Sequence, residues 1–98
     1  MKIVENIDGD LKGLIPVFME ITHQEIEDLR MALDAGDLET ASRIGHNIKG
    51  SALNYGFQHL GAIGRRIESK SIQQDFEGVR VEFELLQQYV KQVKVEFN

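Results

Sequence analysis

Apolar side chains recur every three or four residues along almost the whole chain, and this period limits the possible folds more than any other feature. Spacings of three and four place side chains on one face of an α-helix. The period is strongest near the C-terminus, where we expect one helix carrying a single apolar stripe through the entire segment. The apolar positions there are Phe76, Val79, Phe83, Leu86, Val90, Val93 and Phe97.

A first helix is expected from about residue 14 to residue 35. Pro16 lacks a backbone donor and favours a helix start near residues 14–16, with a loosely helical or extended arm before it. Gly36 suits a left-handed cap that ends the helix. The predicted apolar face comprises Leu11, Ile15, Phe18, Thr22, Ile26, Leu29 and Leu33.

Two more helices lie between these segments. Asp37 is expected to cap the second helix, which Gly56 ends. The third helix follows almost at once, over about residues 57–69, and Ser71 with Gln74 matches a capping box before the fourth. The second stripe contains Leu38, Ala41, Ile44, Gly45, Ile48, Ala52 and Tyr55, and the third contains Leu60, Ile63, Gly64 and Ile67.

Four stripes joined by short turns predict an all-α fold, an antiparallel up-down four-helix bundle with a short N-terminal arm or helix. Hydrophobic residues make up 42% of the 98, which is enough for residues 1–98 to fold as a single domain. A single proline and the lack of alternating apolar and polar residues leave little room for a sheet.

The charge and the reactive side chains exclude several classes of function. A net charge of −5 offers no basic surface for nucleic acid or a membrane. Without cysteine there is no disulfide or thiolate site, and the histidines lack metal-ligand spacing, so we expect no metal and no cofactor. No apolar N-terminal run indicates export or a membrane span, so we expect a cytoplasmic protein.

His46 is the candidate reactive residue. An advance of 100° per residue places His46 about 140° and Gly50 about 180° from the centre of the second apolar stripe, so both face outward. Lys49 lies one turn along, where its ammonium can reach a phosphoryl group attached to the imidazole. Gly50 in a helix interior costs about 1 kcal/mol relative to alanine, which favours close approach by another molecule. Leu53 shares the His46 side and suits a small apolar docking surface.

Simpler interpretations of these residues stay open. A surface histidine is most often a solvated polar side chain, Gly50 can serve helix packing, and Lys49 can pair with a nearby acid. The order Lys49, Gly50, Ser51 does not match a phosphate loop, because no glycine-rich turn from strand to helix precedes it. No serine elbow or pair of catalytic carboxylates is evident, so a hydrolase is disfavoured.

Seven residues together resemble the signature of histidine-containing phosphotransfer (HPt) domains: His46, Lys49, Gly50 and Gly56, followed by Phe57, Leu60 and Glu68. The resemblance covers essentially the whole chain and implies the same four-helix fold. It also implies a phosphorelay intermediate in two-component signal transduction. His46 would accept a phosphoryl group from a histidine kinase or from the aspartate of a response-regulator receiver domain, and would pass it to another receiver.

The resemblance implies roles for the neighbours of His46. Glu68 would accept a hydrogen bond from Nδ1 and orient the ring, which leaves Nε2 as the nucleophile; a plain surface role for Glu68 stays open. Lys49 would neutralise phosphoryl charge, while Gly50 would make space for the receiver. The receiver would bring the Mg²⁺ that transfer requires, so the domain is a carrier and a substrate more than an enzyme.

Two alternatives change the context or the class. The chain can be the phosphotransfer domain of a chemotaxis-type histidine kinase, cut from a longer protein. It can also be a purely structural bundle whose fourth helix pairs with another chain. For a phosphorelay carrier we expect a monomer.

Overall fold

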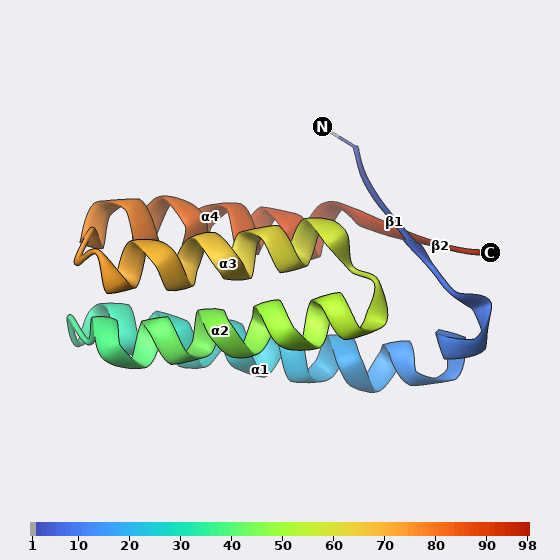
Figure 1. The fold of residues 1–98 in the computed structure, drawn as a ribbon, viewed down its shortest axis with the longest axis horizontal. Helices are drawn as coiled ribbons and strands as arrows, with labels where there is room; N and C mark the ends of the chain where they lie inside the picture. The colour runs from blue at the N-terminus through green and yellow to red at the C-terminus, as the bar shows by residue number, and fades with distance from the viewer. Residues whose placement is uncertain (1) are drawn as a thin grey trace.

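Four long helices form the protein, and the predicted all-α four-helix bundle is confirmed (Figure 1). The structure, a computed structural model, describes residues 2–98. Each helix runs antiparallel to the next, with α1 and α2 in one layer and α3 and α4 in the other. The helices are α1 (Ile15–Asp34), α2 (Leu38–Tyr55), α3 (Gln58–Ile72) and α4 (Phe76–Gln92).

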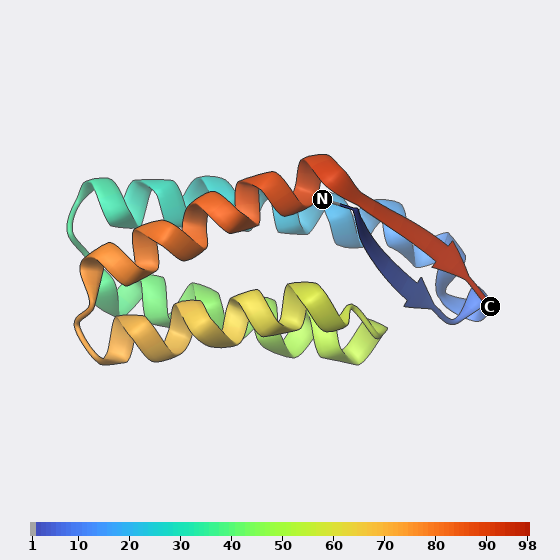
Figure 2. The same ribbon diagram turned by 90° about the horizontal axis from the view of Figure 1, so that it is seen from above.

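The two ends of the chain form a small sheet, which the sequence analysis did not predict. Strand β1 (Ile3–Ile7) pairs in parallel with β2 (Val93–Phe97), and the 3₁₀ helix η1 (Gly9–Leu14) links β1 to α1. Figure 2 shows both strands side by side at one end of the bundle. The whole bundle thus serves as the crossover connection that parallel strands require.

The expected continuation of the fourth helix to Phe97 is wrong, since α4 ends at Gln92. Val93 adopts an extended backbone, with φ −66° and ψ 134°, and begins β2. Residues four apart share a face in a strand as well as in a helix, so the spacing from Val93 to Phe97 fits both structures. The β-branched and aromatic content of this segment favours the strand once β1 offers a pairing edge.

The predicted capping box is also wrong. Ser71 is buried inside α3, which runs to Ile72 instead of ending near residue 69. The side chain of Asp75 caps α4 by accepting a 2.9 Å hydrogen bond from the backbone N–H of Gly78. The start of α1 near Pro16 and the second-helix caps at Asp37 and Gly56 agree with the prediction.

The core contains most of the predicted stripe residues together with two buried acids, whereas Phe97, predicted on the fourth stripe, is exposed. Glu82 of α4 pairs with Arg66 and Lys70 of α3, each nitrogen lying 2.9 Å from a carboxylate oxygen. Among residues 2–98, the buried apolar side chains are Ile7, Ile15, Phe18, Ile26, Leu29, Ala32, Leu33, Leu38, Ala41, Ile44, Ile48, Ala52, Phe57, Leu60, Ile63, Ile67, Val79, Phe83, Leu86 and Tyr89.

Glu5 of β1 joins the terminal sheet to the bundle. Its carboxylate accepts hydrogen bonds from the backbone N–H groups of His59 and Leu60 in the first turn of α3, both at 3.1 Å, and from the Tyr89 hydroxyl at 2.7 Å. Phe57 precedes α3 and has no side-chain acceptor, so Glu5 supplies the cap from another element. Burial, followed by the hydrogen bond to Glu5, raises the pKa of Tyr89 and keeps its hydroxyl a donor.

Within residues 2–98, no helix combines the length and the apolar character that crossing a bilayer requires.

Candidate functional site

The caps of α2 fix the limits of the helix that carries His46. The Asp37 carboxylate accepts hydrogen bonds from the Thr40 backbone N–H at 3.0 Å and from the Thr40 hydroxyl at 2.6 Å. These bonds, that from the hydroxyl first, lower the pKa of Asp37 and keep it ionised at the positive end of the helix dipole. At the other end Gly56 adopts φ 87°, which favours glycine. Between these caps the apolar stripe packs inward, and the side chain of His46 is 62% exposed.

A glycine pair brings α2 and α3 into close contact beside His46. A Cβ on Gly64 of α3 would lie 2.7 Å from the backbone nitrogen of Lys49, and one on Gly45 of α2 would lie 2.7 Å from the backbone nitrogen of Glu68. Such distances leave no room for any side chain, so only glycine permits this helix crossing. The close approach is what places the Glu68 side chain opposite His46 and Lys49.

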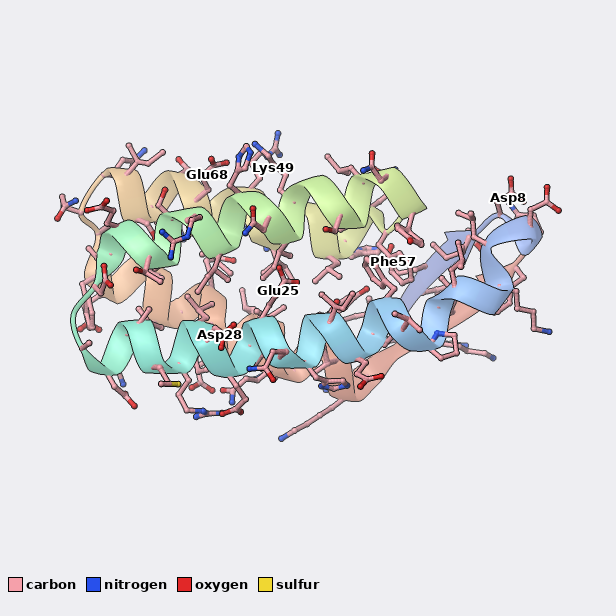
Figure 3. All side chains as sticks on the ribbon, turned by 90° about the horizontal axis from the view of Figure 1, so that it is seen from below. Asp8, Glu25, Asp28, Lys49, Phe57 and Glu68 are labelled. Carbon is pink, nitrogen blue, oxygen red and sulfur yellow. The ribbon has the colours of Figure 1, made fainter. Side chains whose placement is uncertain are left out.

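His46, Lys49 and Glu68 form one hydrogen-bonded cluster. Nδ1 of His46 lies 2.9 Å from Oε2 of Glu68, and Nζ of Lys49 lies 2.9 Å from Oε1 of the same carboxylate. Figure 3 shows the Lys49 and Glu68 side chains next to each other on the side of α2 that faces away from α1. Hydrogen bonds from Lys49 foremost, and then from His46, hold the pKa of Glu68 below its usual value, so the carboxylate is ionised at neutral pH.

This geometry assigns the two ring nitrogens of His46 different states. An ionised carboxylate can only accept a hydrogen bond, so Nδ1 carries the proton that lies between His46 and Glu68. In the neutral ring Nε2 then holds the unprotonated lone pair. The ring is exposed, and its lone pair is available to an electrophile from solvent or from another protein.

Gly50 and Leu53 follow His46 along the outer face of α2. Apart from the adjoining turns of α2 itself, a Cβ on Gly50 would meet no described atom within 4 Å, so this position is open to an approaching molecule. Leu53 is 50% exposed and leans over Gly61 of α3, where a Cβ would lie 2.7 Å from Leu53 Cδ2. Neither residue belongs to the hydrogen-bonded cluster; both shape the surface beside it.

A second apolar surface lies at the junction of η1 and α1, next to α2. Three exposed side chains, Leu14, Val17 and Ile21, line a groove with Ser51 of α2. Glu25 of α1 also lines this groove. Burial foremost, and then the charge of Asp28, raises its pKa to about 6. Figure 3 shows Glu25 between α1 and α2.

The predicted site residues therefore divide into a contacting group of three and two surface neighbours. Sequence reasoning placed Gly45 and Gly64 in the apolar stripes and missed their part in positioning Glu68. Arg65 lies one turn before Glu68 on α3. Across residues 2–98, no cluster of three or more His, Cys, Asp or Glu side chains has the arrangement of a metal site.

Comparison with protein-family models matches the chain to one family. The model of the Hpt domain matches residues 13–96, a range that includes all four helices and every candidate site residue. Searches of curated proteins and of solved structures returned no match.

Proposed function

The chain belongs to the Hpt domain family, whose members carry phosphoryl groups in two-component signalling, and we propose that His46 is the residue that carries the phosphoryl group here. Its partners are the receiver domains of response regulators, a histidine kinase, or both. The protein acts as a phosphoryl carrier and a substrate of those partners, not as a catalyst in its own right.

The observation that carries this proposal is the hydrogen bond between Nδ1 of His46 and Glu68. The Nε2 lone pair attacks the phosphorus of an acyl phosphate on a receiver aspartate. The bond from phosphorus to the aspartate oxygen breaks, and the carboxylate leaves with the electron pair. The new nitrogen–phosphorus bond makes the ring cationic, and Glu68 compensates that charge at Nδ1. Transfer to the next receiver reverses these steps.

Lys49 and Glu68 are positioning and charge-stabilising residues in this scheme. Glu68 holds the ring in the tautomer that exposes Nε2. Lys49, whose side chain is 28% exposed, reaches Glu68 in the resting state and donates to phosphoryl oxygens when they are present. We assign the Mg²⁺ that receiver-dependent transfer requires to the receiver.

Gly50 and Leu53 belong to the docking surface for the receiver. The open space at Gly50 admits the loops that surround a buried aspartate, and Leu53 offers apolar contact area beside the reactive nitrogen. A carrier must release its partner after each transfer, and a small apolar patch of this kind suits a transient complex.

Incubation with a phosphorylated receiver tests the proposal. We expect a label that is stable in base and labile in acid, as a phosphoramidate bond is, and we expect His46→Gln to abolish it while helicity and melting temperature stay nearly unchanged. His23→Gln and His59→Gln are matched controls, because both residues are exposed histidines on other helices. Undiminished labelling of His46→Gln would overturn the assignment.

A further inference from the structure

Arg65 lies at the edge of the candidate site, on the outer face of α3. It follows Gly64, whose Cα packs against the backbone of Lys49, and it precedes Glu68 by one helical turn. Arg65 lines one surface groove with Lys49 and Leu53, and a second groove with Glu68. Arg65 therefore lies beside both members of the Lys49–Glu68 ion pair.

Arg65 has no acidic partner within ion-pair distance anywhere in residues 2–98. Glu68, the nearest acid along α3, has both oxygens engaged: Oε1 by Lys49 and Oε2 by His46. The next residue, Arg66, is different, because its guanidinium pairs with buried Glu82. Arg65 is thus an exposed cation held beside the site without a structural task in the resting protein.

The charge balance at His46 calls for another cation. A phosphoryl group near neutral pH carries a charge of about −1.5 to −2. The charged groups near His46 are Arg43 and Lys49 on α2, three residues away on either side, and Glu68 and Arg65 on α3. Lys49 and Glu68 already form an ion pair, so together they contribute no net positive charge. Of the two arginines, Arg65 lines the grooves that contain Lys49 and Glu68, whereas Arg43 lines neither, so Arg65 is the cation placed to offset the phosphoryl charge.

We propose that Arg65 is a second phosphoryl-binding residue, which donates to the phosphoryl oxygens on Nε2 of His46 together with Lys49. This proposal rests on the proposed function of His46. A guanidinium presents two parallel N–H donors that match a pair of phosphoryl oxygens, whereas an ammonium acts as a point charge. Arg65 would therefore orient the phosphoryl group as well as neutralise it.

The experiment is a ³¹P NMR pH titration of the protein phosphorylated with phosphoramidate. A nearby cation favours the dianionic phosphoryl form and lowers its pKa, so Arg65→Gln should raise that pKa, by about 0.5 unit or more at this exposed position. Arg65→Lys should restore most of the difference. Arg80→Gln is the matched control, because Arg80 is an exposed arginine on α4, away from His46, and it should leave the pKa unchanged.

The possible results distinguish failure of the Arg65 proposal from failure of the proposed function of His46. If the unaltered protein forms no phosphohistidine, the proposed function of His46 fails. If phosphohistidine forms and its phosphoryl pKa is the same in Arg65→Gln as in the unaltered protein, only the role of Arg65 fails. If Arg65→Gln slows transfer from a receiver but leaves the phosphoryl pKa unchanged, the proposal is also overturned. Arg65 would then contact the receiver and not the phosphoryl group. Circular dichroism checks folding, and Arg65→Met provides a second neutral variant.

Discussion

The contact between α2 and α3 yields a sharp prediction, because two glycines on these helices should respond in opposite ways to the same change. In Gly64→Ala the new Cβ would lie 2.7 Å from the Lys49 backbone nitrogen and 2.9 Å from the Gly45 carbonyl oxygen. Ordinary contact begins near 3.4 Å, so the helices must separate by about 0.7 Å at this point. In Gly50→Ala the new Cβ meets no described atom within 4 Å.

The size of each effect follows from packing and helix propensity. Overpacking against backbone atoms costs about 3 kcal/mol at a site that cannot relax, and alanine recovers about 1 kcal/mol of helix propensity. We therefore expect Gly64→Ala to lower the free energy of unfolding by about 2 kcal/mol, whereas Gly50→Ala raises it by up to about 1 kcal/mol. For a domain of this size those changes correspond to roughly −10 °C and +5 °C in Tm.

Urea and thermal unfolding followed by circular dichroism measure both variants. The same separation of the helices lengthens the His46–Glu68 hydrogen bond, so the ¹⁵N shift of Nδ1 should change in Gly64→Ala. It should stay constant in Gly50→Ala. Equal stabilities for the two variants would refute the close packing of α2 on α3 as the feature that positions Glu68.

Three other substitutions probe separate parts of the molecule. The pKa of Glu25 is about 6 in the folded protein, above the unfolded value of 4.5, so its contribution to stability falls as pH rises through this window. After allowance for solvent screening, Glu25→Gln should add about 1 kcal/mol at pH 7 and little at pH 4.5; equal gains in urea melts at both pH values would contradict this. Glu5→Gln leaves one acceptor for three buried donors and should cost about 2 to 3 kcal/mol in the same assay, whereas a loss below about 0.5 kcal/mol would dismiss its capping role. Gly50→Glu should keep the fold but slow transfer from a receiver at least about tenfold, through clash and repulsion; an unchanged rate in rapid-quench measurements would remove Gly50 from the docking surface.

The parts of the fold that depend on local signals could be predicted from the sequence. Asp37 and Gly56 carry the chemistry of a helix start and a helix end within a few residues, so the limits of α2 were recognisable. The helical period then fixed the outward direction of His46 without any knowledge of the other helices.

The parts that depend on distant contacts could not be predicted. In the sequence, Glu5 is only a polar residue of the predicted N-terminal arm. The fold shows that it caps α3, more than fifty residues away. Gly64 looks like a weak core position until Lys49 is seen packed against it. Residues 93–97 fit a helix and a strand equally well by spacing, and the pairing with β1 decides between them.

The most direct test of the central claim is to identify the atom that carries the phosphoryl group. Long-range ¹H–¹⁵N NMR of the phosphorylated, ¹⁵N-labelled protein distinguishes the two imidazole nitrogens of His46 and detects coupling to phosphorus. The account predicts phosphorus on Nε2 and a proton on Nδ1, in keeping with the 2.9 Å contact to Glu68. Phosphorus on Nδ1, or on any residue other than His46, would contradict it.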